Sequence, residues 1–279
     1  MKDFKDKVAV ITGAASGIGR GLAEKCAMEG LRVVISDINE KSLRRTERSL
    51  KRKGCDVLAV ITDVSKAEEI EDLANKTIDA FGEVHMLFNN AGVALPKLTW
   101  EYELEDWEYV LGINLKGVIY GIRTFIPIMI KQDTECHVIN ISSIEGLLSN
   151  GIAGATYGVC KHALVFLTER LAIELEENAP KIKVSVVCPG FVLTNIFLAS
   201  IDRLPDERKN EFLREDMDEE RMEALQDFLE QSPGITPNEV AEIVFRGIKE
   251  QKLHILTHKQ PILKDALKER FDTILRAFD

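Results

Sequence analysis

The sequence predicts an α/β fold: a doubly wound parallel sheet of about seven strands with helices on both faces. Two observations lead to it. Short apolar runs rich in β-branched residues alternate with longer segments whose apolar residues recur at helical spacing. The runs lack polar alternation, which is typical of parallel strands covered on both faces. Right-handed crossovers then make the sheet doubly wound and place ligand sites at the carboxyl ends of its strands.

Seven apolar runs define the strands. The predicted strands are 8–12, 32–37, 57–62, 86–89, 137–142, 183–188 and 253–257. Segments with helical spacing lie between them, and Gly54 and Gly82 mark two helix ends, where glycine is favoured. The predicted helices are 17–29, 40–53, 67–81, 105–111, 115–131 and 157–177. Because no repeat or linker interrupts this alternation, we expect a single domain over 1–279.

Composition excludes several classes of protein. The 279 residues carry 36 Lys and Arg against 46 Asp and Glu, a net charge of −10, which disfavours nucleic-acid binding. No apolar run approaches the length of a membrane span, and the N-terminus lacks a signal-like apolar region, so a cytoplasmic protein is expected. Five scattered cysteines are expected to be reduced thiols, and neither they nor the five histidines show metal-ligand spacing.

The turn after the first predicted strand carries three glycines, in the sequence TGAASGIG at 12–19. Glycines permit a tight turn and let the backbone approach a diphosphate. The N-terminus of the following helix offers free N–H groups and a positive dipole end to the phosphates. The alternative is a plain strand-to-helix turn. The strand before and the helix after favour a dinucleotide-binding site.

Asp37 ends the second predicted strand, 18 residues beyond Gly19. This spacing is close to that of the carboxylate that binds the ribose 2′-hydroxyl of NAD. The same carboxylate would repel the 2′-phosphate of NADP, so NAD is the predicted cofactor. Lys41, Arg44 and Arg45 follow within the next helix and leave NADP possible.

Tyr157 and Lys161 open the long predicted helix, where four-residue spacing puts the phenol and the ammonium on one face. A lysine charge at ~4 Å with an effective dielectric of ~20 contributes about 4 kcal/mol, or roughly three pK units. This would bring the tyrosine to a pKa near 7, where it can pass a proton either way. Upstream, Ser142 and Ser143 end the fifth strand, where a hydroxyl can donate to a carbonyl oxygen. The alternative is an unremarkable Tyr and Lys on a helix surface.

These motifs together resemble those of the short-chain dehydrogenase/reductase family. The resemblance covers about 5–195. It rests on TGAASGIG (12–19), Asp37, Asp63-Val64, Asn89-Asn90-Ala91-Gly92, Asn114, Ser143, Tyr157-x-x-x-Lys161 and the run from Pro189 to Thr194. It implies a Rossmann-type fold and an oxidoreductase that transfers a hydride between NAD(H) and a secondary alcohol or ketone.

The resemblance also implies residue roles. Tyr157 would be the acid–base group, Lys161 would tune it, Ser143 would position the substrate oxygen and Asn114 would hold a proton-relaying water. Asp63 and Val64 would hold the adenine, and Val192 and Thr194 the nicotinamide carboxamide. The implied cofactor-binding residues are Gly13, Ser16, Gly17, Ile18, Gly19, Asp37, Asp63, Val64, Asn90, Ala91, Gly92, Tyr157, Lys161, Pro189, Val192 and Thr194.

Two features depart from the family pattern. Ser143 precedes Tyr157 by 14 residues, whereas the family usually has 13. Glu145 stands where a small or apolar residue is usual, and we expect its side chain to point to solvent.

The C-terminal part is predicted to form a helical substrate lid, 195–232. Residues 206–230 hold eleven Asp and Glu against four Lys and Arg. Their apolar side consists of Phe212, Leu213, Met217, Leu225, Phe228 and Leu229. An apolar, acid-capped cleft predicts a neutral hydrophobic alcohol or ketone as substrate; the alternative is a charged helix that merely packs on the domain.

The tail, 261–279, also has helical apolar spacing. Its apolar residues are Leu263, Leu267, Phe271, Ile274, Leu275 and Phe278. It would dock on its own domain or on a neighbouring subunit. The family resemblance implies a homodimer or homotetramer.

Two other functions remain open: an NADP-preferring carbonyl reductase and a non-catalytic dinucleotide-binding regulator. A regulator could discard the acid–base group, so the presence of Tyr157, Lys161, Ser143 and Asn114 argues against it. The sequence does not determine the particular substrate or the direction of the reaction.

Overall fold

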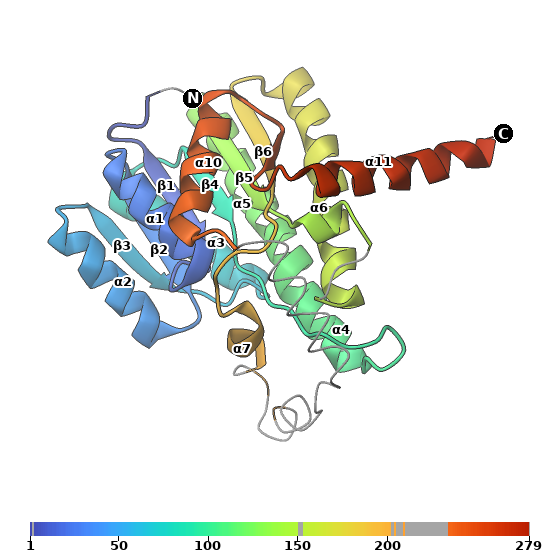
Figure 1. The fold of residues 1–279 in the computed structure, drawn as a ribbon. Helices are drawn as coiled ribbons and strands as arrows, with labels where there is room; N and C mark the ends of the chain where they lie inside the picture. Colours follow the sequence, from blue (N-terminus) through green and yellow to red (C-terminus); the bar gives the residue numbers. More distant parts are fainter. Residues whose placement is uncertain (2, 150–152, 202–203, 205–208, 210–233, 279) are drawn as a thin grey trace.

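The computed structural model describes residues 1, 3–149, 153–201, 204, 209 and 234–278. Seven parallel strands form one sheet in the order β3-β2-β1-β4-β5-β6-β7, which confirms the doubly wound prediction (Figure 1). The strands are β1 (Val8–Thr12), β2 (Arg32–Asp37), β3 (Val57–Ile61), β4 (Met86–Asn89), β5 (Cys136–Ile141), β6 (Ile182–Cys188) and β7 (His254–Leu256). The order reverses between β1 and β4, and a crevice opens at such a switch point.

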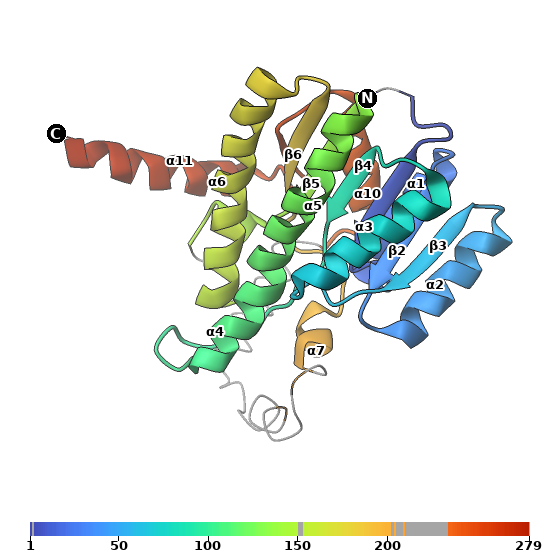
Figure 2. The same ribbon diagram turned by 180° about the vertical axis from the view of Figure 1, so that it is seen from behind.

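Helices cover both faces of the sheet. They are α1 (Gly17–Met28), α2 (Glu40–Arg52), α3 (Ala67–Phe81), α4 (Leu104–Leu111), α5 (Gly117–Gln132), α6 (Ala155–Asn178), α7 (Ile196–Ile201), α10 (Pro237–Lys249) and α11 (Pro261–Leu275). Helices α1, α2 and α10 pack on one face, and α3, α5 and α6 on the other (Figures 1 and 2). Two apolar layers therefore sandwich the strands, as the continuous apolar runs require.

Helix α10 is one element that the sequence-based prediction did not include. Thr236 and Glu239 form a capping box at its start, with Pro237 at the first turn. The helix buries Val240 and Phe245 and packs against α1. A Cβ on Gly21 of α1 would lie 2.7 Å from the Pro237 carbonyl oxygen, so glycine allows this close approach. The capping signal was therefore present in the sequence.

The helical stretch Leu104–Gln132 is long and apolar enough to cross a membrane by length and composition alone. It joins α4 to α5 through the π-helical segment Gly112–Lys116. Val118, Phe125 and Met129 on it are buried in the core. We therefore interpret it as a core helix of the sheet.

The C-terminal elements differ in how they meet the domain. Most of the predicted lid, 195–232, lies outside the described residues; α7 is its described helix. Helix α11 projects away from the sheet in both views and buries none of its residues (Figures 1 and 2). Its Arg270 donates a hydrogen bond to the Leu147 carbonyl, while Phe271 and Phe278 are more than half exposed. The outer half of the tail therefore does not dock on its own domain.

Candidate active site

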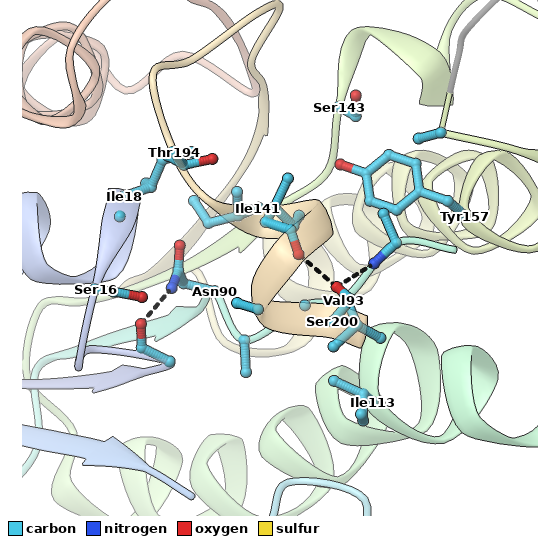
Figure 3. Close-up of a pocket in the computed structure, with 18 of the residues that line it drawn as sticks. Ser16, Ile18, Asn90, Val93, Ile113, Ile141, Ser143, Tyr157, Thr194 and Ser200 are labelled. Atoms are coloured by element: carbon cyan, nitrogen blue, oxygen red, sulfur yellow. Dashed lines mark hydrogen bonds between the residues drawn. The ribbon is translucent and has the colours of Figure 1, made fainter. Parts of the chain in front are cut away.

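A cavity of about 670 Å³ opens at the carboxyl ends of the strands, where the strand order reverses. Of the predicted site residues, sixteen line it and two, Gly19 and Asn114, do not. The sixteen are Gly13, Ser16, Gly17, Ile18, Asp37, Asp63, Val64, Asn90, Ala91, Gly92, Ser143, Tyr157, Lys161, Pro189, Val192 and Thr194. Figure 3 shows Ser143 and Tyr157 on one side of the cavity and Ser16, Ile18 and Asn90 on the other.

The glycine-rich turn brings the backbone of β1 and α1 to the cavity. Gly13 has a φ of +66°, which favours glycine, and a Cβ there would lie 2.8 Å from the Cα of Ala91. A Cβ on Gly19 would lie 2.2 Å from the Gly13 carbonyl oxygen. Gly19 therefore packs the helix against the turn, while Gly13 and Ser16 face the cavity. This cradle and the free N–H groups at the start of α1 suit a diphosphate.

Asp37 is buried at the end of β2 with its carboxylate held by two backbone groups. Its Oδ2 accepts from the Ala15 N–H at 3.1 Å, and its Oδ1 accepts from the Asn39 N–H at 2.9 Å. Among the described residues that line the cavity, Lys161 is the only lysine or arginine. Lys41, Arg44 and Arg45 are not among those lining residues. The adenosine end of the cavity therefore presents a fixed carboxylate and suits an unphosphorylated ribose.

The loops after β3 and β4 complete that end of the cavity. The Asp63 carboxylate accepts from both the N–H and the hydroxyl of Ser65, at 3.0 and 2.7 Å. The Asn90 amide donates to the carbonyl oxygens of Thr12 and Gly13, at 2.8 and 3.2 Å. Asn90 thereby fastens the loop after β4 to the glycine-rich turn.

The two serines at the end of β5 have different partners. Ser142 donates its hydroxyl to the Lys161 carbonyl oxygen at 2.7 Å, which ties the strand to α6. Ser143 Oγ accepts from the Glu145 N–H at 3.2 Å, so its own proton can point to another acceptor. Ser143 lies beside the Tyr157 hydroxyl (Figure 3). The geometry therefore favours Ser143 over Ser142 as the hydroxyl that meets a substrate.

Lys161 lies beneath the tyrosine and is buried. Its Nζ donates to the Ile141 carbonyl oxygen at 2.8 Å and lies 5.3 Å from the centre of the Tyr157 ring. Burial lowers the pKa of Lys161 to about 8. Burial also raises the pKa of Tyr157, which the nearby Ser143 hydroxyl partly offsets. The sequence-based expectation of a phenol pKa near 7 is therefore wrong for this structure, because it counted the lysine charge and omitted desolvation.

Asn114 does not reach the cavity, although it supports it. It is fully buried in the π-helical segment, a local irregularity often found at functional sites. Its side-chain amide makes two 2.8 Å hydrogen bonds, accepting from the Val93 N–H and donating to the Val93 carbonyl. A Cβ on Gly92 would lie 3.4 Å from Asn114 Oδ1 and 3.6 Å from Lys161 Nζ. The asparagine thus fixes the segment at which the lysine and the loop after β4 converge.

The loop after β6 closes the cavity from the side of β7. The Gly190 N–H donates to His258 Nδ1 at 3.1 Å, and a Cβ on Gly190 would lie 2.8 Å from that ring. Farther along, Thr194 faces α1, since a Cβ on Gly17 would lie 3.3 Å from its methyl carbon. These contacts hold the loop from Pro189 to Thr194 between His258, just after β7, and the glycine-rich turn.

Sequence reasoning missed several residues that line the substrate end. Ser200 Oγ accepts from the Ala94 N–H at 2.9 Å and donates to the Ile196 carbonyl at 2.6 Å. Tyr109 donates to the Ser200 carbonyl at 3.3 Å. Glu145 also lines the cavity, so the expectation that it points to solvent is wrong. Helix α7 is too short for apolar periodicity to reveal, which is why Ser200 gave no signal.

The fold and the site together define a class of protein: a dinucleotide-binding oxidoreductase with a tyrosine, a serine and a lysine at the cofactor crevice. A family model described as short chain dehydrogenase matches residues 7–203. The chain therefore belongs to the short-chain dehydrogenase/reductase family, as the sequence motifs indicated. It is an oxidoreductase that acts on alcohol and ketone groups with a nicotinamide dinucleotide.

Individual relatives match this chain over 72–99% of its length. The CLA biosynthesis dehydrogenase/reductase of Lactiplantibacillus plantarum is 36% identical over 272 residues, covering 96% of this chain and 94% of that protein. A diacetyl reductase ((S)-acetoin forming) of Staphylococcus epidermidis is 37% identical over 201 residues, covering 72% and 76%. A crystal structure of a family member from Burkholderia phymatum, in complex with NAD, is 38% identical with a TM-score of 0.89, covering 99% and 97%.

Proposed function

We propose that the protein transfers a hydride between NAD(H) and a secondary alcohol or ketone, with Tyr157 moving the proton. One observation carries this proposal: Ser143, Tyr157 and Lys161 converge at the end of the cavity opposite the glycine-rich cradle. NAD, when bound, supplies the hydride acceptor, and NADH supplies the donor. Side chains of this protein bind the substrate and transfer the proton.

In this mechanism the substrate oxygen lies between the hydroxyls of Ser143 and Tyr157. Ser143 donates a hydrogen bond to it, because the Glu145 N–H already occupies one acceptor position on Ser143. Tyr157 gives its proton to the oxygen in ketone reduction and takes it in alcohol oxidation. Lys161 stabilises the phenolate, and Asn114 holds the Val93 segment that lines the cavity beside them. A water held near Asn114 would pass protons to Lys161.

Asp37 supports NAD over NADP. Its carboxylate is fixed by the Ala15 and Asn39 backbone at the place where the ribose 2′ position is expected. A phosphate there would meet a negative charge with no lining lysine or arginine to offset it among the described residues at that end. The similarity to a family member in complex with NAD agrees with this assignment.

A neutral, largely apolar substrate fits the far end of the cavity. Its walls there include Val93, Tyr109, Phe191, Ile196 and Phe197. The described part of the expected lid, α7, supplies the last two. The relative that reduces diacetyl acts on a small ketone, which supports a ketone or alcohol here as well.

We also propose a homodimer or homotetramer in the cytoplasm. Val159, Phe166 and Ile173 lie seven residues apart on α6 and are at least half exposed, and Ile119 and Ile130 are exposed on α5. Such an apolar surface is typical of a helix–helix interface. The five cysteines are all free thiols, which suits a reducing compartment.

Replacement of Tyr157 by phenylalanine tests the function. The absorbance of reduced nicotinamide is followed with a set of secondary alcohols and ketones, using both NAD and NADP. We expect Tyr157→Phe to lose turnover at least 100-fold, the size expected for a general acid–base group, and to retain NADH binding in a fluorescence titration. A wild type that binds NADH but turns over none of these substrates would support the non-catalytic regulator. Unchanged turnover in Tyr157→Phe would contradict the role of Tyr157, and faster turnover with NADP would support the carbonyl reductase alternative.

A further inference from the structure

Glu145 places a carboxylate beside the hydroxyls that would bind the reacting oxygen. It lies in the short 3-10 turn Ile144–Gly146, which Ser143 caps by accepting from the Glu145 N–H. Glu145 lines the cavity and is only partly exposed. Because Ser143 is two residues away along this turn, the acid stands at the substrate end of the cavity and not at the cofactor end.

The Glu145 side chain bridges two walls of the cavity. Its Oε1 accepts from the Ala153 N–H at 3.2 Å, and Ala153 also lines the cavity, just before α6. Tyr157 follows in the first turn of that helix. The carboxylate is therefore fastened between the segment that carries Ser143 and the segment that carries Tyr157.

The charge of Glu145 is felt at the reacting hydroxyls. It is one of the groups that raise the pKa of Tyr157, although burial is the larger cause. The other acid that lines this region, Glu108, has an exposed side chain and pairs with Lys116 at 3.0 Å. Phe191, Ile196 and Phe197 also line this cavity, and a charge in a partly apolar cavity is screened less than one in water.

We propose that Glu145 determines specificity: it favours substrates with a hydroxyl or ammonium donor on the carbon next to the reacting carbon and rejects those with a carboxylate there. An ionised carboxylate accepts several hydrogen bonds, so it can serve the Ala153 N–H and a substrate donor together. A substrate carboxylate at the same place would bring two like charges together in a partly dehydrated cavity. This inference deepens the proposed function and rests on it.

Three ketones that share one hexyl chain test the inference: an ethyl ketone, a hydroxymethyl ketone and an α-keto acid. Each is reduced with NADH by the wild type, by Glu145→Gln and by Glu145→Ala. Glutamine keeps an acceptor for the Ala153 N–H and removes the charge. Glu174→Gln is the matched control, because Glu174 is an exposed glutamate on α6 that pairs with Arg170 away from the cavity.

For Glu145→Gln we express kcat/KM relative to the value of the same variant for the ethyl ketone, because loss of the charge near Tyr157 acts on all three substrates alike. This relative value should fall about tenfold for the hydroxymethyl ketone, since a charged acceptor gives way to a neutral one, and rise about tenfold for the keto acid. Glu145→Ala should shift the same two ratios in the same directions, with an additional uniform loss from the freed loop. Glu174→Gln should leave all three values unchanged.

An equal change for all three ketones in both Glu145 variants would overturn the proposal, because it would mark a purely structural role. Unchanged ratios would overturn it as well. A wild type that binds NADH and reduces none of the three would instead contradict the proposed function, and this inference would fail with it. Melting temperatures and NADH titrations of each variant separate a folding defect from a change in specificity.

Discussion

The carboxylate of Asp37 accepts a hydrogen bond from the backbone N–H of Ala15 at 3.1 Å, which joins the end of β2 to the glycine-rich turn after β1. Two motifs that lie 22 positions apart in the sequence are thereby one unit of structure. The acid orients the turn and, in our proposal, also selects the cofactor. Its removal should therefore alter both binding strength and cofactor preference.

We predict that Asp37→Ala raises the KM for NAD at least tenfold and narrows the NAD-to-NADP preference by a similar factor. The reason is the loss of a charged hydrogen bond to ribose together with the loss of repulsion against a 2′-phosphate. Initial rates with both cofactors at a fixed alcohol concentration measure this. Equal losses with NAD and NADP would mean that Asp37 only supports the turn.

Lys161 should lower the free energy of unfolding of the protein, although the proposed reaction requires it. Burial lowers its pKa from 10.5 to about 8, so below pH 8 folding must bury a charge that water would stabilise, a cost of about 3 kcal/mol. Lys161→Met removes this cost and the roughly 1 kcal/mol hydrogen bond to the Ile141 carbonyl. We predict that the variant is about 2 kcal/mol more stable at pH 7 and has lost turnover.

The pH dependence of the stability gained in Lys161→Met follows from the lowered pKa of Lys161. The folded protein binds fewer protons at Lys161 than the unfolded chain between about pH 8 and 10.5, so the penalty shrinks as the pH rises through this window. Urea unfolding of wild type and Lys161→Met at pH 7 and pH 10 measures it. An advantage that grows toward pH 10 would contradict the assignment.

Two glycine-to-alanine substitutions should have opposite effects on the stability of the protein. In Gly19→Ala the new Cβ would lie 2.2 Å from the Gly13 carbonyl oxygen, so the turn must shift; we predict a loss of stability of about 1–3 kcal/mol and at least tenfold weaker NADH binding. Gly158 lies inside α6, and a Cβ there would be 4.0 Å from the nearest atom outside the helix, the Glu145 carbonyl oxygen; Gly158→Ala should therefore raise the free energy of unfolding by about 0.5–1 kcal/mol. Chemical unfolding and NADH fluorescence test the pair.

Val159, Phe166 and Ile173 form an exposed apolar stripe on α6, and a charge at its centre should disrupt subunit association. Phe166 is 69% exposed in the single chain. If this helix forms the subunit interface, Phe166→Glu should yield a monomer at micromolar concentration by light scattering, with an unchanged melting curve at low protein concentration. Glu174→Gln on the same helix serves as the control. A wild type that is itself monomeric would contradict the proposed assembly.

The sequence alone determined the parallel sheet, the glycine-rich turn and the identity of the candidate catalytic residues. These features are local: an apolar run, a glycine pattern or a four-residue spacing is written in consecutive positions, and each falls within a residue or two of its predicted place. The strand at β7 was also found, although it has only three residues in the structure. Helix α10 was missed, although its capping box is present in the sequence and the predicted strand 253–257 follows it directly.

The tertiary structure decided how those residues behave. Three properties depend on atoms that folding brings together from distant segments. They are the charge of Lys161, the use of Ser142 and not Ser143 in a hydrogen bond to α6, and the position of Glu145 at the cavity. Desolvation is a property of the packed surroundings, so a charge–charge estimate from spacing gave the wrong direction for Tyr157. A sequence names the groups of a site, whereas burial and hydrogen-bond partners, which exist only after folding, set their chemistry.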